Sequence, residues 1–296
     1  MKLTIIKLMS IFCIFISNES IAQTVITLTE PFSASGGLSV DRSGVVYVAN
    51  YGDSLKRGDG ANIFKVDFNG KVTVFASGLV GASGNEFDSK VNLYQSNITG
   101  NKISKITPDG TVSLFTAAII KNPVGVTVDN LDNIYNTNCK KQAEIIKTTP
   151  AGVSTIFASD SLLSCPNGLT IDSDGNLYTA NFNNGRVIKI TQAGVVSVLA
   201  TVPGENNGHL IFGNGRLYVV ARGANQIYEV SLTGDVKLLA GTGAKGNSDG
   251  DALQSTWYIP NGIGINSSGT KLYISDKVAG TGTELNPTVV RMITGF

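Results

Sequence analysis

Three asparagines and one histidine in this chain are candidates for ligand binding or catalysis, because of their side-chain chemistry and their positions in the sequence. Asn167, Asn207 and Asn261 each directly precede a glycine in a similar sequence context, and His209, the only histidine, follows one. Carboxamide groups can hydrogen-bond a ligand, and a histidine can act as general base in ester or lactone hydrolysis. His209 also aligns with apolar residues in similar segments, so a packing role remains open.

Other candidates lie in one Gly- and Asp-rich segment. Trp257 could stack on a sugar or aromatic ring, or it could pack its own loop. Asn247, Asp249 and Asp251 could bind calcium within that loop, although their spacing is not that of a helix-flanked calcium loop and turn chemistry also explains them. One Gly-x-Ser-x-Gly segment occurs, Gly246–Gly250, but it lies inside this Gly- and Asp-rich loop rather than at a strand-to-helix turn, so a serine hydrolase is not supported.

An internal repeat determines where these residues should lie. In one copy, the apolar runs Pro166–Asp172 and Asn176–Asn181 flank the turn Ser173–Gly175, and the runs Arg186–Ile190 and Val195–Thr201 follow. Short runs that are rich in β-branched residues and bounded by Gly, Asn or Asp are typical of antiparallel strands joined by tight turns. Each copy is therefore predicted to form one four-stranded antiparallel sheet.

Three markers each occur six times along the chain. The first strand of a copy opens with an aligned glycine, at Gly37, Gly84, Gly125, Gly168, Gly208 and Gly262. The second strand carries an aligned tyrosine, at Tyr47, Tyr94, Tyr135, Tyr178, Tyr218 and Tyr273. A turn glycine follows the third strand, at Gly70, Gly110, Gly152, Gly194, Gly234 and Gly295. A spacing of about 40 to 55 residues predicts an all-β, six-bladed β-propeller of four-stranded blades.

The first strand of the chain should close this propeller. The sixth copy reaches Phe296 just after its third strand, and Thr24–Thr29 resembles the fourth strand of other copies, such as Val72–Phe75. We expect Thr24–Thr29 to complete blade six, because closing the ring removes exposed strand edges. A linear stack of repeats would leave one lone strand and one three-stranded unit.

Most of the candidate residues are expected on one face of the propeller. Inner strands begin and second strands end on the same face near the axis, so Asn167, Asn207 and Asn261 should meet there. That face should also collect the residues three positions after the aligned tyrosines, including Asn50, Asn97, Asn138, Asn181 and Asp276. Three long connections emerge on it, namely Gly52–Gly60, Gly241–Pro260 and Val278–Pro287. Long loops on a rigid scaffold usually carry binding, which marks this face as the functional candidate.

Strand-end asparagines have a structural explanation as well. Asn and Asp side chains hydrogen-bond adjacent turns, and a repeat reproduces that role in every blade. We favour turn capping for Asn50, Asn97 and Asn138, and keep Asn181 as a candidate ligand contact beside the three asparagines that precede glycines.

The pattern in these copies resembles a known family. A glycine-opened strand ending in Asp172, a glycine turn and the strand Leu177–Asn181 resemble the NHL repeat, as does the loop Gly241–Asp251. The blade organisation is similar to that of the gluconolactonase/regucalcin family. This resemblance implies the propeller fold but leaves function open, because propellers serve binding modules, lyases, hydrolases and oxidoreductases.

The family resemblance also implies a possible metal site. Divalent-metal ligands occupy the channel mouth in that family; Asn167 matches an Asn ligand, whereas Asn207 stands in place of an Asp and Gly36 in place of a Glu. Asn261 and Asp276 could complete a rearranged site. Neutral amides alone would hold calcium or another divalent cation weakly.

Two functions therefore remain open at this stage. One is a non-catalytic propeller that binds a small molecule, glycan or protein on its asparagine-rich face. The other is a metal-dependent lactone or ester hydrolase, in which His209 and Asp276 are the catalytic candidates.

The first residues resemble an export signal. Met1–Ala22 contains two early lysines, the apolar run Leu8–Ile16 and small residues at Ser20 and Ala22, which is typical of a cleaved signal peptide. We expect residues 23–296 to form a single exported domain, periplasmic or secreted. The apolar run is shorter than the roughly 20 residues that a membrane span needs, so no transmembrane anchor is expected.

Charge and cysteine content limit the remaining possibilities. Without the signal segment the chain has 21 basic and 21 acidic residues, and no basic stripe, so nucleic-acid binding is not expected. Cys139 and Cys165 are the two cysteines left. In an oxidising compartment, and on the same predicted face, they should form a disulfide.

Overall fold

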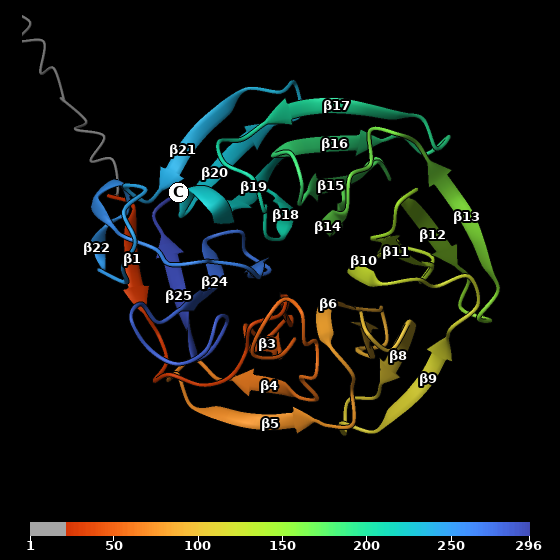
Figure 1. Ribbon diagram of the computed structural model, residues 1–296, viewed down its shortest axis with the longest axis horizontal. Helices are drawn as coiled ribbons and strands as arrows, with labels where there is room; N and C mark the ends of the chain where they lie inside the picture. Colours follow the sequence, from red (N-terminus) through yellow and green to blue (C-terminus); the bar gives the residue numbers. More distant parts are fainter. Residues whose placement is uncertain (1–21) are drawn as a thin grey trace, which may run out of the picture.

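The computed structural model describes residues 22–296, which form a closed ring of sheets (Figure 1). Six antiparallel sheets surround one axis, five of them with four strands and one with five. The predicted six-bladed propeller is therefore confirmed. The segment 1–22 lies outside the described residues except for Ala22. Within the described range, no helix is long and apolar enough to cross a membrane.

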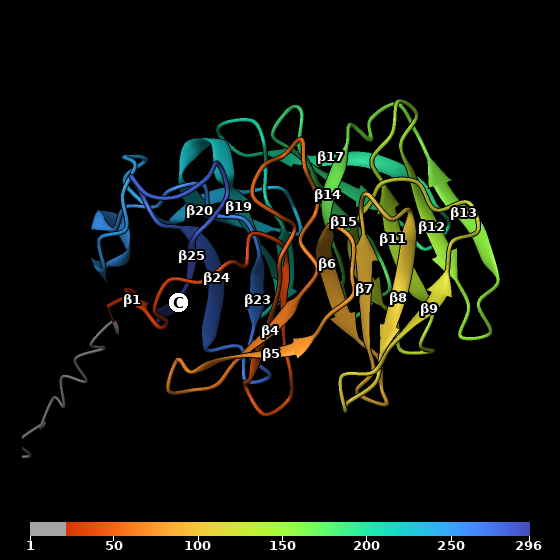
Figure 2. The same cartoon turned by 60° about the horizontal axis from the view of Figure 1, so that its bottom comes forward.

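The first three blades follow the predicted strand order. Blade one comprises β2 (Leu38–Val40), β3 (Val46–Ala49), β4 (Ile63–Val66) and β5 (Val72–Ala76). Blade two comprises β6 (Ala82–Phe87), β7 (Leu93–Asn97), β8 (Lys102–Ile106) and β9 (Val112–Thr116), which stand side by side in Figure 2. Blade three comprises β10 (Pro123–Val128), β11 (Ile134–Asn138), β12 (Glu144–Thr148) and β13 (Ser154–Ser159).

The last three blades contain the irregular elements. Blade four comprises β14 (Pro166–Ile171), β15 (Leu177–Asn181), β16 (Arg186–Ile190) and β17 (Val196–Thr201). Blade five comprises β18 (Leu210–Gly213), β19 (Arg216–Ala221), β20 (Gln226–Ser231) and β21 (Val236–Ala240), with the 3-10 turn η1 (Arg222–Ala224) after β19. Blade six comprises β23 (Ile263–Ile265), β24 (Lys271–Lys277), β25 (Thr288–Thr294), β1 (Thr24–Thr27) and β22 (Gly250–Asp251), which precedes the 3-10 turn η2 (Ala252–Gln254).

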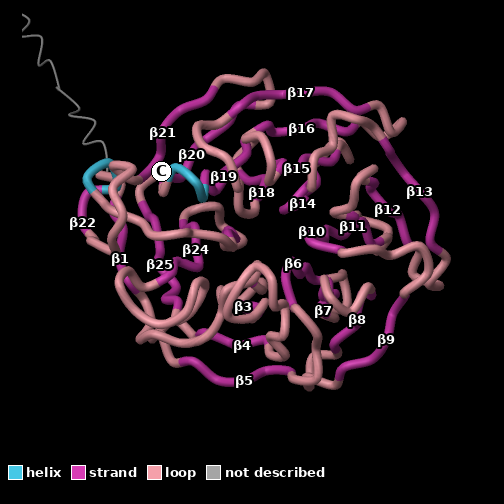
Figure 3. The backbone as a smooth tube through the Cα atoms, in the orientation of Figure 1, coloured by secondary structure: helices cyan, strands magenta, loops and turns pink. Residues whose placement is uncertain are grey.

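The aligned glycines let the inner strands meet at the axis. Figure 3 shows β6, β10, β14 and β18 around the centre and β5, β9, β13, β17 and β21 on the perimeter. A Cβ on Gly84 would lie 2.5 Å from the carbonyl oxygen of Val124, and one on Gly125 would lie 2.5 Å from that of Asn167. Neither contact is sterically possible without moving a neighbouring backbone. The backbone of the next blade thus leaves no room for a side chain at these positions, which requires glycine there.

The aligned tyrosines help to build the core between blades. All six are buried, and Tyr47 packs edge-to-face against Phe75 of its own blade and Phe87 of blade two, with ring centroids 4.9 and 5.0 Å apart. The same buried cluster joins Ile63 of blade one to Leu93 of blade two. Tight contacts of this kind between successive sheets fix their positions around the axis.

The N-terminal strand closes the ring as predicted. β1 pairs antiparallel with β25, Thr24 opposite Thr294 and Thr27 opposite Arg291, and Val25 is fully buried. The structure adds one element, because β22 pairs with the outer edge of β1. The Asp249 carboxylate just before β22 accepts hydrogen bonds from the Thr27 backbone N–H, at 2.7 Å, and from Arg291. The long loop after blade five therefore secures the closing strand.

We expect Gly125→Ala to lower the free energy of unfolding by roughly 3 kcal/mol, because its methyl group would overlap the backbone of blade four. Gly100→Ala is the matched control, since its nearest contact would be the Asn97 Cβ at 3.2 Å, and it should stay within about 0.5 kcal/mol of the wild type. Urea denaturation measures both. Equal stability of the two variants would contradict the close approach of the inner strands.

Candidate functional site

A hollow of about 310 Å³ opens over the axis on the face that carries the long loops. We call it the channel-mouth hollow. Residues of all six blades line it. Its floor consists of Ser83, Val124, Asn167 and Asn261, and its walls include Tyr51, Ile98, Phe182 and Arg222. Two long loops contribute Leu55 and Leu285. The register supports the predicted geometry, since Pro166 at the start of β14 lies opposite Asn181 at the end of β15.

The floor presents polar groups to the hollow. Its residues stand directly before the aligned glycines, where inner strands begin. The Asn167 amide donates to the backbone carbonyl of Asn207, at 2.6 Å, and the Asn261 amide donates to the carbonyl of Ser35, at 2.8 Å. Neither side-chain oxygen accepts a hydrogen bond from a residue that the structure describes. Both oxygens therefore remain available as acceptors for a ligand.

Asn207 and His209 lie deeper. Asn207 is fully buried, does not line the channel-mouth hollow, and its Oδ1 and Nδ2 have no hydrogen-bond partner among residues 22–296. The His209 imidazole reaches across the axis, so that a Cβ on Gly37 would lie 2.8 Å from its Cε1. Burial, and secondarily the charge of Arg222, lower the pKa of His209 to about 4. The imidazole that packs against Gly37 is therefore neutral at pH 7.

The walls come from residues four positions after the aligned tyrosines in five of the blades. Tyr51, Ile98, Phe182 and Arg222 occupy this position in blades one, two, four and five. In blade three it is Cys139, which forms the predicted disulfide with Cys165, and both cysteines line the hollow. The walls are thus mainly apolar and aromatic, with a covalent link between blades three and four.

Arg222 is the residue that the sequence analysis missed. Its side chain is only 8% exposed, and within the described part of the chain its guanidinium forms no hydrogen bond or ion pair. Burial lowers its pKa to about 10, while Glu284 opposes the lowering. The sequence signal was a break in the repeat: Ala221 replaces the asparagine or aspartate found three residues after the other five aligned tyrosines, and Arg222 follows it.

Asn181 performs the same structural task as its counterparts. Its Oδ1 accepts the backbone N–H of Ser164, at 3.0 Å, and its Nδ2 donates to the Leu162 carbonyl. Asn97 and Asn138 accept backbone N–H groups from the loops that lead into their own blades in the same way. These side chains hold the entry loops of the inner strands, and Asn181 is fully buried beneath the site.

Asp276 and Trp257 belong to a buried network around Arg291. The Asp276 carboxylate accepts from Arg291 at 3.0 Å, from the Tyr258 N–H at 2.9 Å and from Asn247 at 2.8 Å. Trp257, fully buried, stacks on the Arg291 guanidinium with its ring centroid 4.1 Å away. Asp249 pairs with the same arginine. This network attaches the loop Gly241–Pro260 to blade six, so Asp276 and Trp257 do not line the channel-mouth hollow.

The residues present do not fit a tightly held divalent cation. No Asp or Glu of the described chain lines the channel-mouth hollow, and residues 22–296 contain no cluster of three His, Cys, Asp or Glu side chains suited to a metal. The oxygens of Asn167 and Asn261 are neutral donors, and the Asp276 carboxylate is already neutralised by Arg291. Ligand charge sets much of the affinity for hard cations, so such a set would bind them weakly.

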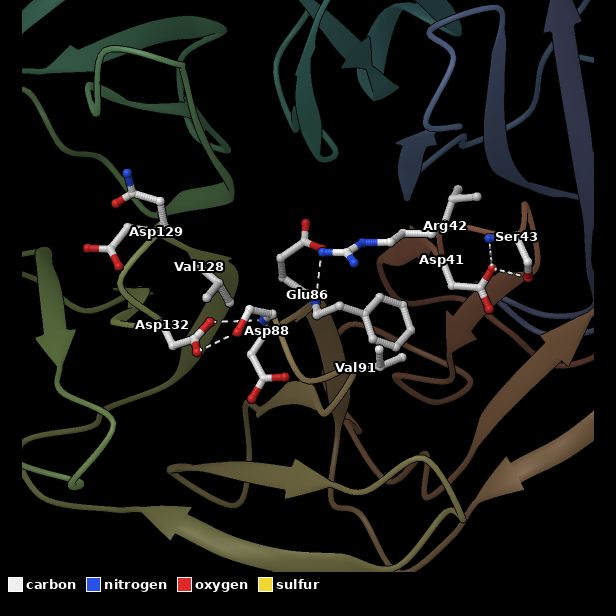
Figure 4. A pocket seen from close by; sticks show the side chains of 13 residues that line it. Asp41, Arg42, Ser43, Glu86, Asp88, Val91, Val128, Asp129 and Asp132 are labelled. Carbon is white, nitrogen blue, oxygen red and sulfur yellow. Dashed lines mark hydrogen bonds between the residues drawn. The ribbon is translucent and has the colours of Figure 1, made fainter.

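A second hollow, on the opposite face, is larger but structurally explained. It measures about 550 Å³ and is lined by Asp41, Glu86, Asp88, Asp129 and Asp132 (Figure 4). Asp41, Asp88 and Asp129 follow inner strands and accept backbone N–H groups of their own turns. Asp132 accepts from Ser89 of the neighbouring blade. The aspartate carboxylates therefore hold turns and neighbouring blades together, whereas Glu86, whose pKa burial raises to about 7, accepts the adjacent N–H of Phe87. We assign this hollow no ligand.

Comparison with protein families supports this architecture. The family described as the SMP-30/gluconolactonase/LRE-like region matches residues 5–223. The match covers well over half of the chain, and the chain belongs to this family. A search of curated proteins by sequence found no match.

Solved structures share the fold at low sequence identity. An auxiliary nutrient binding protein from Bacteroides ovatus superposes with a TM-score of 0.73 at 16% identity, over 92% of this chain and 76% of that one. A gluconolactonase from Xanthomonas campestris gives 0.70 at 15% identity, over 91% and 89% of the two chains. Virginiamycin B lyase from Staphylococcus aureus gives 0.61 at 17% identity, over 92% and 98%. At these identities the likeness establishes the fold alone.

Reduction of the Cys139–Cys165 disulfide should lower the free energy of unfolding by about 3 kcal/mol, because it closes a loop with a sequence separation of 26. Chemical denaturation with and without reductant measures the difference. The double variant Cys139→Ser/Cys165→Ser should show no response to reductant. If reductant lowered the free energy of unfolding of that variant by the same amount, the loss of stability would not come from the disulfide.

Stability should depend on pH through His209. The folded pKa of about 4 lies below the value of about 6.5 expected in the unfolded chain, so the unfolded state binds more protons between these values. The contribution of His209 to stability therefore falls as pH decreases from 6.5 to 4, by about 3 kcal/mol. His209→Gln should remove this component. Denaturation of both proteins between pH 4 and 6.5 gives the His209 contribution as the difference between their free energies of unfolding. If the two free energies changed with pH in the same way, the buried neutral imidazole would be contradicted.

Proposed function

We propose that this protein is a non-catalytic propeller that binds a small organic molecule in the channel-mouth hollow. The observation that carries the proposal is the composition of the hollow, which combines a polar floor with apolar and aromatic walls and contains no carboxylate. Binding sites for small molecules combine a largely apolar surface with a few placed polar groups in this way. A volume of about 310 Å³ suits a small ligand better than a protein segment or an extended glycan.

Two further observations support a binding role over metal-dependent hydrolysis. The neutral donors at the floor are poor ligands for a divalent cation, and His209, with a pKa near 4, is a weak general base at neutral pH. The structural neighbour from Bacteroides ovatus is described as an auxiliary nutrient binding protein, and this likeness in fold supports the proposal of a binding role.

We place the protein outside the cytoplasm as part of this proposal. The support is the signal-like segment Met1–Ala22 together with the disulfide, since disulfides persist mainly in oxidising compartments. Mass analysis of protein recovered from culture medium and cell fractions tests the location and the start of the mature chain.

Filling the channel-mouth hollow should abolish binding. Ile98→Trp places a large ring in the wall, whereas Val74→Trp, on the outer strand β5 where Val74 is 58% exposed, is the matched control. A fragment library of neutral and acidic compounds, screened by thermal shift, should yield saturable binders for wild type and Val74→Trp but not for Ile98→Trp. Binding that is retained in Ile98→Trp would place the ligand elsewhere.

The same purified protein tests the alternative function, a metal-dependent hydrolase. Elemental analysis of protein purified without chelator, followed by a lactone panel with and without added divalent metal, should show neither stoichiometric metal nor turnover. A bound metal that is lost together with turnover in Asn167→Ala would replace the binding function with a metal-dependent lactonase.

A further inference from the structure

The unpaired guanidinium of Arg222 is the strongest unsatisfied charge at the site. Arg222 follows β19, lines the channel-mouth hollow and is 8% exposed. The guanidinium lies over the ring of Phe182, whose centroid is 5.9 Å from the guanidinium carbon. Glu284 attracts Arg222 through space but accepts the Leu55 N–H at 3.3 Å, and it forms no ion pair with Arg222.

Such an arrangement is unfavourable in the ligand-free protein. Proteins normally pair a charge that is largely buried, because its hydration there is incomplete. The other buried arginine, Arg291, shows the usual solution, with hydrogen bonds to Asp249, Asp276 and two backbone carbonyls. Arg222 has no such set among the described residues. Its missing partner should be an anionic group that enters from the hollow.

We propose that the channel-mouth hollow selects a small organic acid and that Arg222 binds its carboxylate. This inference rests on the proposed binding function and specifies its ligand class. Guanidinium and carboxylate form two parallel hydrogen bonds, an arrangement that lysine does not reproduce. Phe182, Tyr51 and Ile98 receive the apolar body of the acid. Asn167 and Asn261, whose side-chain oxygens are free, accept hydrogen bonds from a hydroxyl or N–H of the same molecule.

The first experiment needs no ligand. Replacing Arg222 with methionine removes an unpaired buried charge and keeps much of its volume, so Arg222→Met should raise the melting temperature of the ligand-free protein by about 3 °C. Arg186→Met, at an exposed position of β16 outside the hollow, should leave it unchanged. A melting temperature lowered by Arg222→Met would make Arg222 a structural residue and overturn the proposal.

The second experiment measures selectivity for the anion. Benzoate, mandelate and 3-phenyllactate, each paired with its primary amide, are titrated by calorimetry into wild type, Arg222→Met and Arg186→Met at constant ionic strength. We expect at least one acid to bind wild type and Arg186→Met, and its affinity to fall by about 10- to 100-fold in Arg222→Met. The corresponding amide should bind wild type and Arg222→Met equally and weakly.

The outcomes separate this inference from the proposed function. If an acid and its amide bind equally well and Ile98→Trp abolishes both, the hollow is a binding site but the acid selectivity is wrong. If no acid binds wild type at millimolar concentration, the proposal for Arg222 is overturned. If the fragment library also yields no binder, the binding function itself fails.

Discussion

The close approach of six inner strands at the axis is the constraint on which this structure depends. A single added methyl group at Gly84 or Gly125 would meet the backbone of the next blade at 2.5 Å. Because the blades approach so closely, the buried His209 ring of blade five comes against Gly37 of blade one. The channel-mouth hollow therefore ends at a floor, and residues placed directly before the glycines form that floor.

The repeat determines the scaffold, and departures from the repeat form the site. Residues that recur in every blade, such as the buried tyrosines and the loop-anchoring Asn97, Asn138 and Asn181, support the architecture through the same contacts each time. The hollow instead depends on positions where blades differ. Four residues after the aligned tyrosine, the side chain changes from Tyr51 to Phe182 to Arg222, and of these three only Arg222 carries a charge.

Much of the fold followed from local sequence signals, whereas the chemistry of the site depended on distant partners. Blade number, ring closure and the Cys139–Cys165 pair were predicted because repeats, strand patterns and the few cysteines are visible in the sequence. Asn167 and Asn261 were expected at the channel mouth, and both line the hollow there. No sequence pattern indicated that Arg291 would pair with Asp276 and stack on Trp257, or that Arg222 would lack such a partner. Hydrogen-bond partners of buried charges arise from packing, which repeat alignment does not reveal.

The pairing of β1 with β25 has a consequence for the order of folding. Thr24 meets Thr294 across nearly the whole chain length, so this contact closes a very long loop and gains nothing until the last blade is present. Blades one to five can form from neighbouring segments, but blade six must wait for both of its parts. A chain handled in an extended state during synthesis or transport would keep its first strand unpaired until the final residues arrive, and assembly would finish with one late docking step.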